Sequence, residues 1–362
     1  MKAIIIYSLA LAALTSCAKS EEAITPDNPN NPLPPKEIHI SAAIEASAQT
    51  KAVTRVNATL TGALDGTVDI PGIQFLKKDA TNSTSLSFAD ATPYVGTRTA
   101  NNNTGTGGDI TFTSASQPQY SLVDQNAYFV AYYPAGTLDE SAKTAAITID
   151  GKTDILYTEI YDAGTYTEPK PGTTGSTHMT FKHALAQLEV ICQTNSAESK
   201  DAVRDTWGQI TKIELATNNT ATYTYGTHVF TFSDTGSGTK LPLVNSDYKT
   251  DFATVDIPDG SSTPTTATAA GMFAPTTTAS ALSLTITTAK LTQTVTVNLY
   301  AESDTGESTQ MSFEAGKTHK VTLTFNSTTK DITVTKTEVA AWGDGYKGTG
   351  DVKPDNATPV TP

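Results

Sequence analysis

The sequence predicts an all-β protein, and three observations lead to this fold class. Threonine makes up about one residue in six, and this β-branched residue favours strands over helices. Only 17% of the residues are charged, against roughly 25% in an average soluble protein. Short runs of alternating apolar and polar residues recur along the chain, separated by Gly, Asn, Asp and Pro. Such alternation is typical of strands that bury one face.

The clearest predicted strands carry an apolar residue at every second position. These residues are Leu282, Leu284 and Ile286; Val295, Val297 and Leu299; Val321, Leu323 and Phe325; and Ile332 with Val334. Residues 326–331, between the last two runs, have the length and polarity of a hairpin loop. Residues 196–206 are the one segment whose pattern suggests a helical turn or two.

The length of the chain favours two domains. Residues 36–345 exceed the roughly 250–300 residues at which a single hydrophobic core usually stops growing. A polar stretch near residues 194–206 separates two predicted strands and marks the best boundary. We therefore expect an N-terminal β-sandwich domain over residues 36–195 and a C-terminal one over residues 196–345, each about as long as one sandwich. Residues 346–362 are expected to form a flexible tail.

The first residues are typical of a bacterial lipoprotein signal. Residues 1–16 hold one lysine and an apolar run of about a dozen residues, which is too short to span a bilayer. Leu14-Thr15-Ser16-Cys17 resembles a lipobox, so Cys17 is the expected site of lipidation; the alternative is an ordinary signal peptide. Several acyl chains would anchor the protein stably. Residues 17–35, rich in Pro, Asn and acids, predict a disordered tether.

The charge balance and the scattered reactive residues exclude several function classes. With 24 Lys and Arg against 37 Asp and Glu, the net charge is −13, so the chain offers no basic surface for nucleic acid. The five histidines are dispersed without metal-ligand spacing, and no nucleophile motif is present. Cys192 lies in an apolar run, as a buried structural thiol does. We therefore expect no enzyme activity, no catalytic residue, no metal site and no cofactor.

Three segments, in order along the chain, together resemble the fimbrillin family of type V pilus proteins from Bacteroides-type bacteria. They are Ala127–Pro134 (AYFVAYYP) with Asp154–Tyr157 (DILY); Phe181–Val190 (FKHALAQLEV), the most specific; and Phe313–Leu323 (FEAGKTHKVTL) with Ile332–Val334 and Trp342-Gly343. Their residues are typical of structure rather than chemistry. His183, at a strand entrance, is expected to be a hydrogen-bonded packing residue, and Trp342 is expected to cap the second core.

The resemblance implies two tandem transthyretin-like Greek-key β-sandwich domains that assemble by strand exchange. In this family an arginine- or lysine-directed surface protease removes an N-terminal strand, and a C-terminal strand of the next subunit fills the vacated groove. Residues 36–55 would be the removable strand here, because Ile38, Ile40, Ala42 and Ile44 alternate with polar residues. Thr54-Arg55 before Val56 is similar to the family's processing site, so cleavage is expected after Arg55; the alternative is an ordinary exposed arginine.

The resemblance leaves the position in a pilus open. The tail beyond Trp342 holds Gly and Pro where a central strand needs amide donors, so residues 331–341 could donate instead. A shaft, tip or anchor role at the outer-membrane surface fits this family, with other fimbrial subunits as partners and a host or glycan molecule as the adhesion ligand. The alternative is a monomeric surface lipoprotein that binds glycans through exposed aromatic residues, for which the candidates are Tyr128, Tyr132, Tyr133, Tyr157, Tyr161 and Tyr166.

Overall fold

A computed structural model describes residues 33–44, 69–100, 108–113, 117–123, 125–170, 178–233, 239–261, 266–299 and 310–341. Over these ranges the chain forms twenty strands and one helix, so the prediction of an all-β fold is confirmed. The contacts within the chain divide it into two compact units, residues 1–35 and residues 36–362. All the strands and the helix named here belong to the second unit. The one helix within the described ranges is too short and too polar to cross a membrane.

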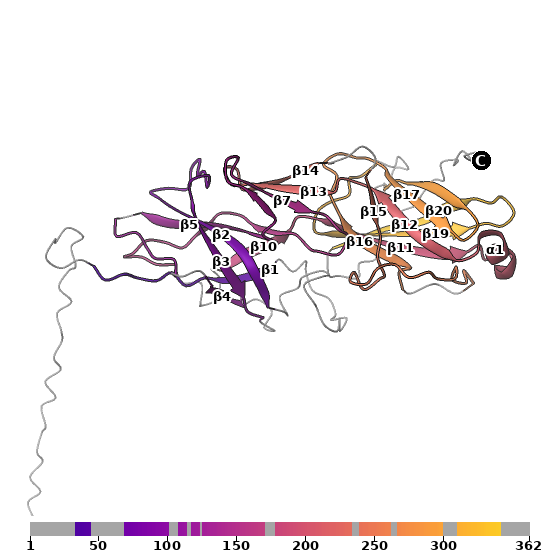
Figure 1. Ribbon diagram of the computed structural model, residues 1–362, viewed down its shortest axis with the longest axis horizontal. Helices are drawn as coiled ribbons and strands as arrows, with labels where there is room; N and C mark the ends of the chain where they lie inside the picture. Colours follow the sequence, from indigo (N-terminus) through magenta and orange to yellow (C-terminus); the bar gives the residue numbers. More distant parts are fainter. Residues whose placement is uncertain are drawn as a thin grey trace, which may run out of the picture. The chain divides into compact units, whose positions relative to one another are not determined.

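Eight strands form the first sheet, in the order β2-β3-β4-β1-β10-β8-β5-β9 (Figure 1). The strands are β1 (Ser41–Ile44), β2 (Ile70–Ala80), β3 (Thr92–Arg98), β4 (Gly108–Phe112), β5 (Asn126–Tyr133), β8 (Leu156–Thr158), β9 (Tyr161–Asp162) and β10 (Met179–His183). Strand β2 also pairs with β5, from Gln74 opposite Tyr132 to Ala80 opposite Asn126. This pairing closes the sheet on itself around one hydrophobic core.

Strand β5 explains why one of the motif segments is apolar throughout. Ala127, Phe129 and Ala131 point into the core inside the first sheet, whereas Tyr128, Val130 and Tyr132 belong to the second core, on the other face. A strand that is buried on both faces has apolar residues at consecutive positions instead of at alternate positions. The sequence AYFVAYY therefore places β5 between two cores.

A small four-stranded sheet, in the order β14-β13-β7-β6, joins segments that are far apart in the sequence. Its strands are β6 (Thr137–Asp139), β7 (Thr144–Thr148), β13 (Thr220–Thr224) and β14 (Val229–Ser233). The Tyr223 ring stacks on that of Tyr132 in β5 with centroids 4.4 Å apart, and the hydroxyls of Tyr132 and Tyr225 lie 2.9 Å apart. The β13–β14 hairpin follows the expected domain boundary at residues 195 and 196, yet it pairs with β7, which precedes that boundary.

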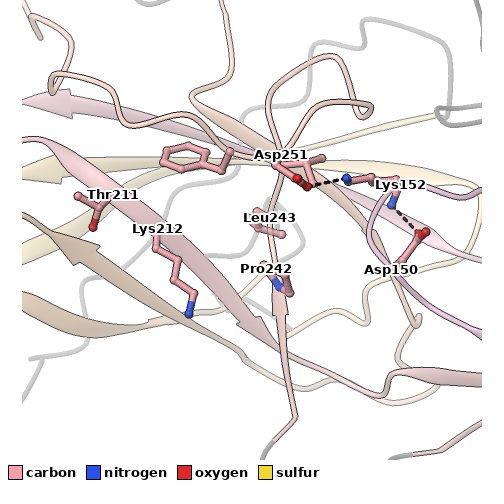
Figure 2. Close-up of a pocket in the computed structure, with 9 residues that line it drawn as sticks. Asp150, Lys152, Thr211, Lys212, Pro242, Leu243 and Asp251 are labelled. Atoms are coloured by element: carbon pink, nitrogen blue, oxygen red, sulfur yellow. Dashed lines mark hydrogen bonds and ion pairs between the residues drawn. The ribbon is translucent and has the colours of Figure 1, made fainter.

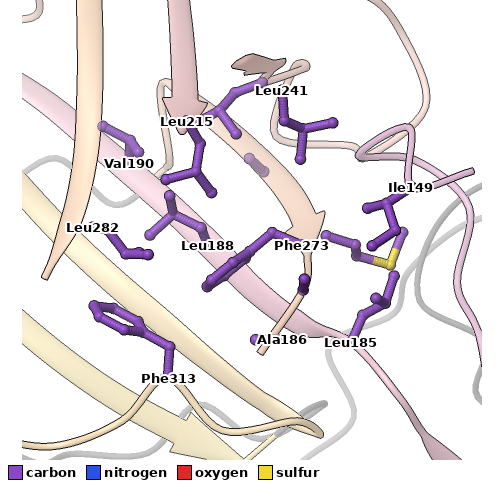
Figure 3. Packing of buried hydrophobic residues seen from close by; sticks show 14 of the residues in the cluster. Ile149, Leu185, Ala186, Leu188, Val190, Leu215, Leu241, Phe273, Leu282 and Phe313 are labelled. Atoms are coloured by element: carbon purple, nitrogen blue, oxygen red, sulfur yellow. The ribbon is translucent and has the colours of Figure 1, made fainter. Parts of the chain in front are cut away.

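Two further sheets pack face to face around the second core (Figure 3). One has the order β16-β11-β19-β20 and the other β15-β12-β17-β18. The strands are β11 (Ala186–Thr194), β12 (Ile210–Ala216), β15 (Lys240–Pro242), β16 (Ala269–Phe273), β17 (Leu282–Thr288), β18 (Thr292–Val297), β19 (Lys317–Phe325) and β20 (Ile332–Ala341). The stripes predicted from the sequence fall on β17, β18, β19 and β20, and residues 326–331 join β19 to β20 as a hairpin loop.

One helix, α1 (Lys200–Trp207), connects β11 to β12, where the sequence suggested a helical turn. Trp207 and Val203 are its buried residues. Gly208 follows the helix with a φ of 78°, a positive value that glycine adopts at least cost. The Trp207 indole N–H donates to the Asn326 carbonyl oxygen at 2.9 Å. Helix α1 thereby covers the end of the second core beside the β19–β20 loop.

Acid is expected to destabilise the second core through His319 in β19. This residue is 1% exposed and packs against the rings of Phe313 and Phe273. Burial, aided by the charge of Lys317, lowers its pKa from 6.5 to about 4, because the apolar surroundings disfavour the imidazolium. The unfolded chain takes up the proton first. Stability is therefore full above pH 6.5 and falls by up to about 3 kcal/mol as the pH drops to about 4.

Thermal unfolding between pH 7 and pH 4.5 measures this effect in the wild type and in His319→Gln. The variant should lose less stability on acidification than the wild type does. His39→Gln is the matched control, because the His39 side chain is 72% exposed. If all three proteins lose stability equally, His319 does not carry the acid sensitivity.

Candidate functional site

The candidate functional site is the groove in the first sheet that β1 occupies. Strand β1 pairs in parallel with β10, Ala42 lying opposite Met179, and antiparallel with β4, Ala42 lying opposite Gly108. The pairing extends ahead of the strand, because the Ile110 N–H donates to the Ile40 carbonyl oxygen at 2.9 Å. The Ile38 N–H donates to the carbonyl oxygen of Pro118 at 2.8 Å. The segment thus lies inside the sheet, with a neighbour on each side.

The side chains of this segment alternate as the sequence predicts up to Ile40, whereas Ser41 on the other face is also buried, at 3% exposed. Ile38, Ile40 and Ala42 are 0%, 2% and 0% exposed and belong to the core inside the first sheet. Ile44 is partly buried against the same core. By contrast, the His39 side chain is 72% exposed. The four residues named from the sequence therefore share one buried face, and this face fills part of the core.

Arg98, the last residue of β3, contacts β1 across the end of β4. It is 2% exposed, and its Nε–H donates to the Ala42 carbonyl oxygen at 2.8 Å. Gly108 leaves space for the Arg98 side chain. A Cβ at this position would lie 1.9 Å from the Thr99 carbonyl oxygen and 3.2 Å from the Arg98 guanidinium carbon. The hydrogen bond continues the pairing of β1 past the point where β4 begins. A hydrogen bond to a charged donor contributes about 1.5–3 kcal/mol.

Lys36 fixes the start of the segment. Its Nζ donates to the Tyr166 carbonyl oxygen at 2.9 Å and lies 5.4 Å from the Tyr166 ring centroid and 6.0 Å from that of Tyr120. The Tyr120 N–H donates to the Lys36 carbonyl oxygen, and the Tyr120 hydroxyl donates to the Ala163 carbonyl oxygen at 2.9 Å. Burial raises the pKa of Tyr120 to about 12, so the hydroxyl stays protonated as a donor at neutral pH.

Sequence reasoning missed Arg98, Lys36 and Tyr120 as parts of this site. A weak signal existed for Arg98, because it is one of only three arginines in the chain. Cys17, the expected lipidation site, Arg55, the expected processing site, and Trp342, the expected cap, lie outside the described residues. Lipidation and processing therefore stay predictions.

The described residues show structural rather than reactive roles for the groups singled out in the sequence. The His183 Nδ1 lies 2.9 Å from the Asp154 Oδ2 and both side chains are buried, which confirms His183 as a hydrogen-bonded packing residue. Cys192 is fully buried, and burial raises its thiol pKa to about 12, far from that of a reactive thiolate. Over the described ranges, no group of three His, Cys, Asp or Glu side chains is placed to hold a metal ion.

The tyrosines proposed as a glycan platform are only partly accessible. Tyr128, Tyr132 and Tyr133 are 4%, 1% and 7% exposed and belong to the cores, as expected for about half of the set. The other three, Tyr157, Tyr161 and Tyr166, are partly buried and pack against the two cores. Their rings are therefore used largely for packing.

Figure 2 shows a surface cleft of about 430 Å³ whose lining includes no residue of β1. Its lining residues are Asp150, Lys152, Thr211, Lys212, Pro242, Leu243, Val244, Asp251 and Phe252. The polar groups bind one another: Lys152 Nζ lies 2.6 Å from Asp251 Oδ1, and Asp150 Oδ1 accepts from the backbone N–H groups of Lys152 and Thr153. These contacts are those of a surface turn.

Comparison with solved structures finds similar proteins at low sequence identity. A candidate cell adhesion protein from Bacteroides uniformis is 17% identical, with a TM-score of 0.51 over 84% of this chain and 99% of that chain. A similar protein from Bacteroides ovatus is 16% identical, with a TM-score of 0.48 over 86% of this chain and 99% of that chain. The tip fimbrial protein Mfa3 from Porphyromonas gingivalis, truncated at its C-terminus, is 12% identical, with a TM-score of 0.40 over 85% and 100%.

The first of these likenesses shows that the fold is shared. A comparison with curated proteins found no match. The fimbrillin-like family model matches residues 50–342, which is more than half of the chain and includes the three motif segments as far as Trp342. The chain belongs to the fimbrillin-like family.

Proposed function

We propose that this chain is a structural subunit or an accessory protein, at the tip or the anchor, of type V fimbriae and that it assembles by β-strand complementation. Its membership of the fimbrillin-like family supports a fimbrial and adhesive role. The observation that carries the assembly mechanism is the place of β1: a segment near the start of the chain fills an interior position between β4 and β10 (Figure 1). On this proposal residues 36–195 and 196–345 form two transthyretin-like Greek-key sandwich domains, with β11 at the end of the first segment contributing a strand to the second sandwich.

In the proposed mechanism a surface protease cuts after Arg55 and residues 36–55 leave. Their departure exposes the hydrogen-bonding edges of β4 and β10 and uncovers the core beside Ile38 and Ile40. Each buried Ile contributes about 2 kcal/mol, and each backbone hydrogen bond adds about 1 kcal/mol net. Spontaneous release is therefore rare, which suits a proteolytic trigger. A strand from another subunit then restores both the hydrogen bonds and the buried surface.

The proposal also sets the location. Removal of residues 1–16 and lipidation of Cys17 would hold the unprocessed protein at the outer-membrane surface. The partners would be other fimbrial subunits, an arginine-directed surface protease and a host ligand. The net charge of −13 favours solubility outside the cell.

Processing and assembly are tested in cells that make the wild type, Arg55→Ala or Lys51→Ala. N-terminal sequencing of surface protein should find a start at Val56 in the wild type and in Lys51→Ala, which keeps Arg55, but not in Arg55→Ala. Electron microscopy with a specific antibody should find labelled filaments only in the first two strains. Surface protein that starts at Cys17 alone and stays dispersed in every strain contradicts the proposal.

A further inference from the structure

We infer that the β1 groove is built for a strand from a different chain, one with two large aliphatic residues followed by a small residue at alternate positions. The C-terminal strand of a second copy of this protein does not fit. This inference rests on the proposed strand complementation and adds to it the kind of partner that the groove accepts.

The shape of the groove follows from the three enclosed side chains of the segment. Ile38 and Ile40 fill the core, and Ala42 is 0% exposed between Gly108 of β4 and Met179 of β10. Because protein cores are close-packed, a fully enclosed alanine cannot be enlarged without displacing its neighbours. The groove therefore requires the order large, large, small at every second residue.

The apolar surroundings of Ala42 add a second requirement at the small position. Ala42 is 0% exposed and belongs to the core inside the first sheet. A cationic side chain placed at this position would be enclosed in that apolar core. An unpaired buried charge loses its hydration without compensation. A neutral, small residue is therefore required where Ala42 lies.

Strand β20, the last strand within the described ranges, fails both requirements along its aliphatic face. Ile332 and Val334 are its only two large aliphatic residues at consecutive alternate positions. If they replace Ile38 and Ile40 in the same direction, Lys336 falls at the Ala42 position. If the strand runs the other way, Lys330 falls there. The Lys336 side chain is 47% exposed in β20 and pairs with Glu338, whereas the groove would enclose it.

The opposite face of β20 has a better small residue but too little aliphatic surface. Its best alignment puts Thr337, Val339 and Ala341 at the places of Ile38, Ile40 and Ala42. Thr337 would bury a hydroxyl in an apolar core, and Val339 is smaller than the isoleucine it replaces. Beyond Ala341, the sequence WGDGYKGTGDVKPDNATPVTP has no run of two alternate large aliphatic residues. No part of the C-terminal segment therefore matches the groove.

The test uses the full chain with a specific protease site in place of residues 53–56. The folded protein is cut at this site, so that the β1 segment is no longer covalently attached and a peptide can replace it. Fluorescent peptides compete for the groove, and binding is measured by anisotropy. One peptide is residues 36–47 and its variant carries Ala42→Lys. The other is residues 331–345 and its variant carries Lys336→Ala, which restores the order large, large, small.

The peptide of residues 36–47 should bind, and the Ala42→Lys change should weaken binding by at least about 100-fold. The peptide of residues 331–345 should also bind at least about 100-fold more weakly than residues 36–47, and Lys336→Ala should recover at least about 10-fold. Binding of residues 331–345 within 10-fold of residues 36–47 would overturn the inference and leave strand complementation standing. Failure of residues 36–47 to enter the cut protein would instead overturn strand complementation, and the inference with it.

Discussion

Replacing Ile40 with aspartate is expected to lower the free energy of unfolding by about 4–5 kcal/mol. Ile40 is 2% exposed in the core inside the first sheet, so the change removes buried aliphatic surface and places a carboxylate where no water reaches it. Thermal and urea unfolding followed by circular dichroism measure the loss. A second effect is also expected, because a weakened β1 should leave its groove before the rest of the sheet unfolds.

His39→Asp is the matched control, because it introduces the same charge one residue away on the opposite face of the strand. The His39 side chain is 72% exposed, and exposed substitutions usually change stability by no more than about 0.5 kcal/mol. Limited proteolysis separates release of β1 from global unfolding: Ile40→Asp should be cut early within residues 36–44, and His39→Asp should resist like the wild type. Equal stability and equal digestion of the two variants would mean that β1 does not support the fold.

The sequence predicts this strand well, because its information is local. Alternation of Ile38, Ile40 and Ala42 with polar residues identifies both the strand and its buried face, whichever strands flank it. The stripes of β17 and β19 and the hairpin loop at residues 326–331 are predictable for the same reason. What alternation does not supply is the choice of neighbours, which is decided by contacts between distant residues.

Two contacts illustrate that limit. The parallel pairing of β11 with β19 places Gln187 beside Thr318, 131 residues later, where the two side chains form a hydrogen bond. Likewise, β13 pairs with β7 from the other side of the expected boundary. Neither pairing leaves a periodic pattern in the chain. Arg98 is a further case, because it acts on β1 from a strand that pairs with β4 instead.

Trp207 is a buried core residue that the sequence pattern does not single out. The sequence predicts Trp342 as a cap of the second core, and this stays a prediction. Trp342 lies outside the described residues, while Trp207 at the end of α1 closes the core near Phe325. Helix α1 has only eight residues, so its apolar pattern is too short to predict a buried face. Its last residue, Trp207, is nevertheless among the largest buried side chains.

Trp207→Ala is expected to lower the free energy of unfolding by about 4 kcal/mol. The side chain is 1% exposed, its ring meets that of Phe325 edge-on with centroids 5.3 Å apart, and its N–H donates to the Asn326 carbonyl oxygen at 2.9 Å. Truncation leaves a cavity that the surrounding strands cannot fill and removes the donor from that carbonyl. Urea unfolding followed by circular dichroism measures the change without relying on the lost fluorophore.

Two companion variants separate packing from hydrogen bonding. Trp207→Phe keeps a ring against Phe325 but removes the N–H, so its loss should be about 1–2 kcal/mol. Thr206→Ala changes the preceding, partly exposed residue of the helix and should cost no more than about 1 kcal/mol, because it removes one hydrogen bond to the Ala202 carbonyl oxygen. If Trp207→Phe proves as damaging as Trp207→Ala, the hydrogen bond to the β19–β20 loop, and not the filled core, holds α1 in place. If Trp207→Ala is no worse than Thr206→Ala, the helix does not close the second core.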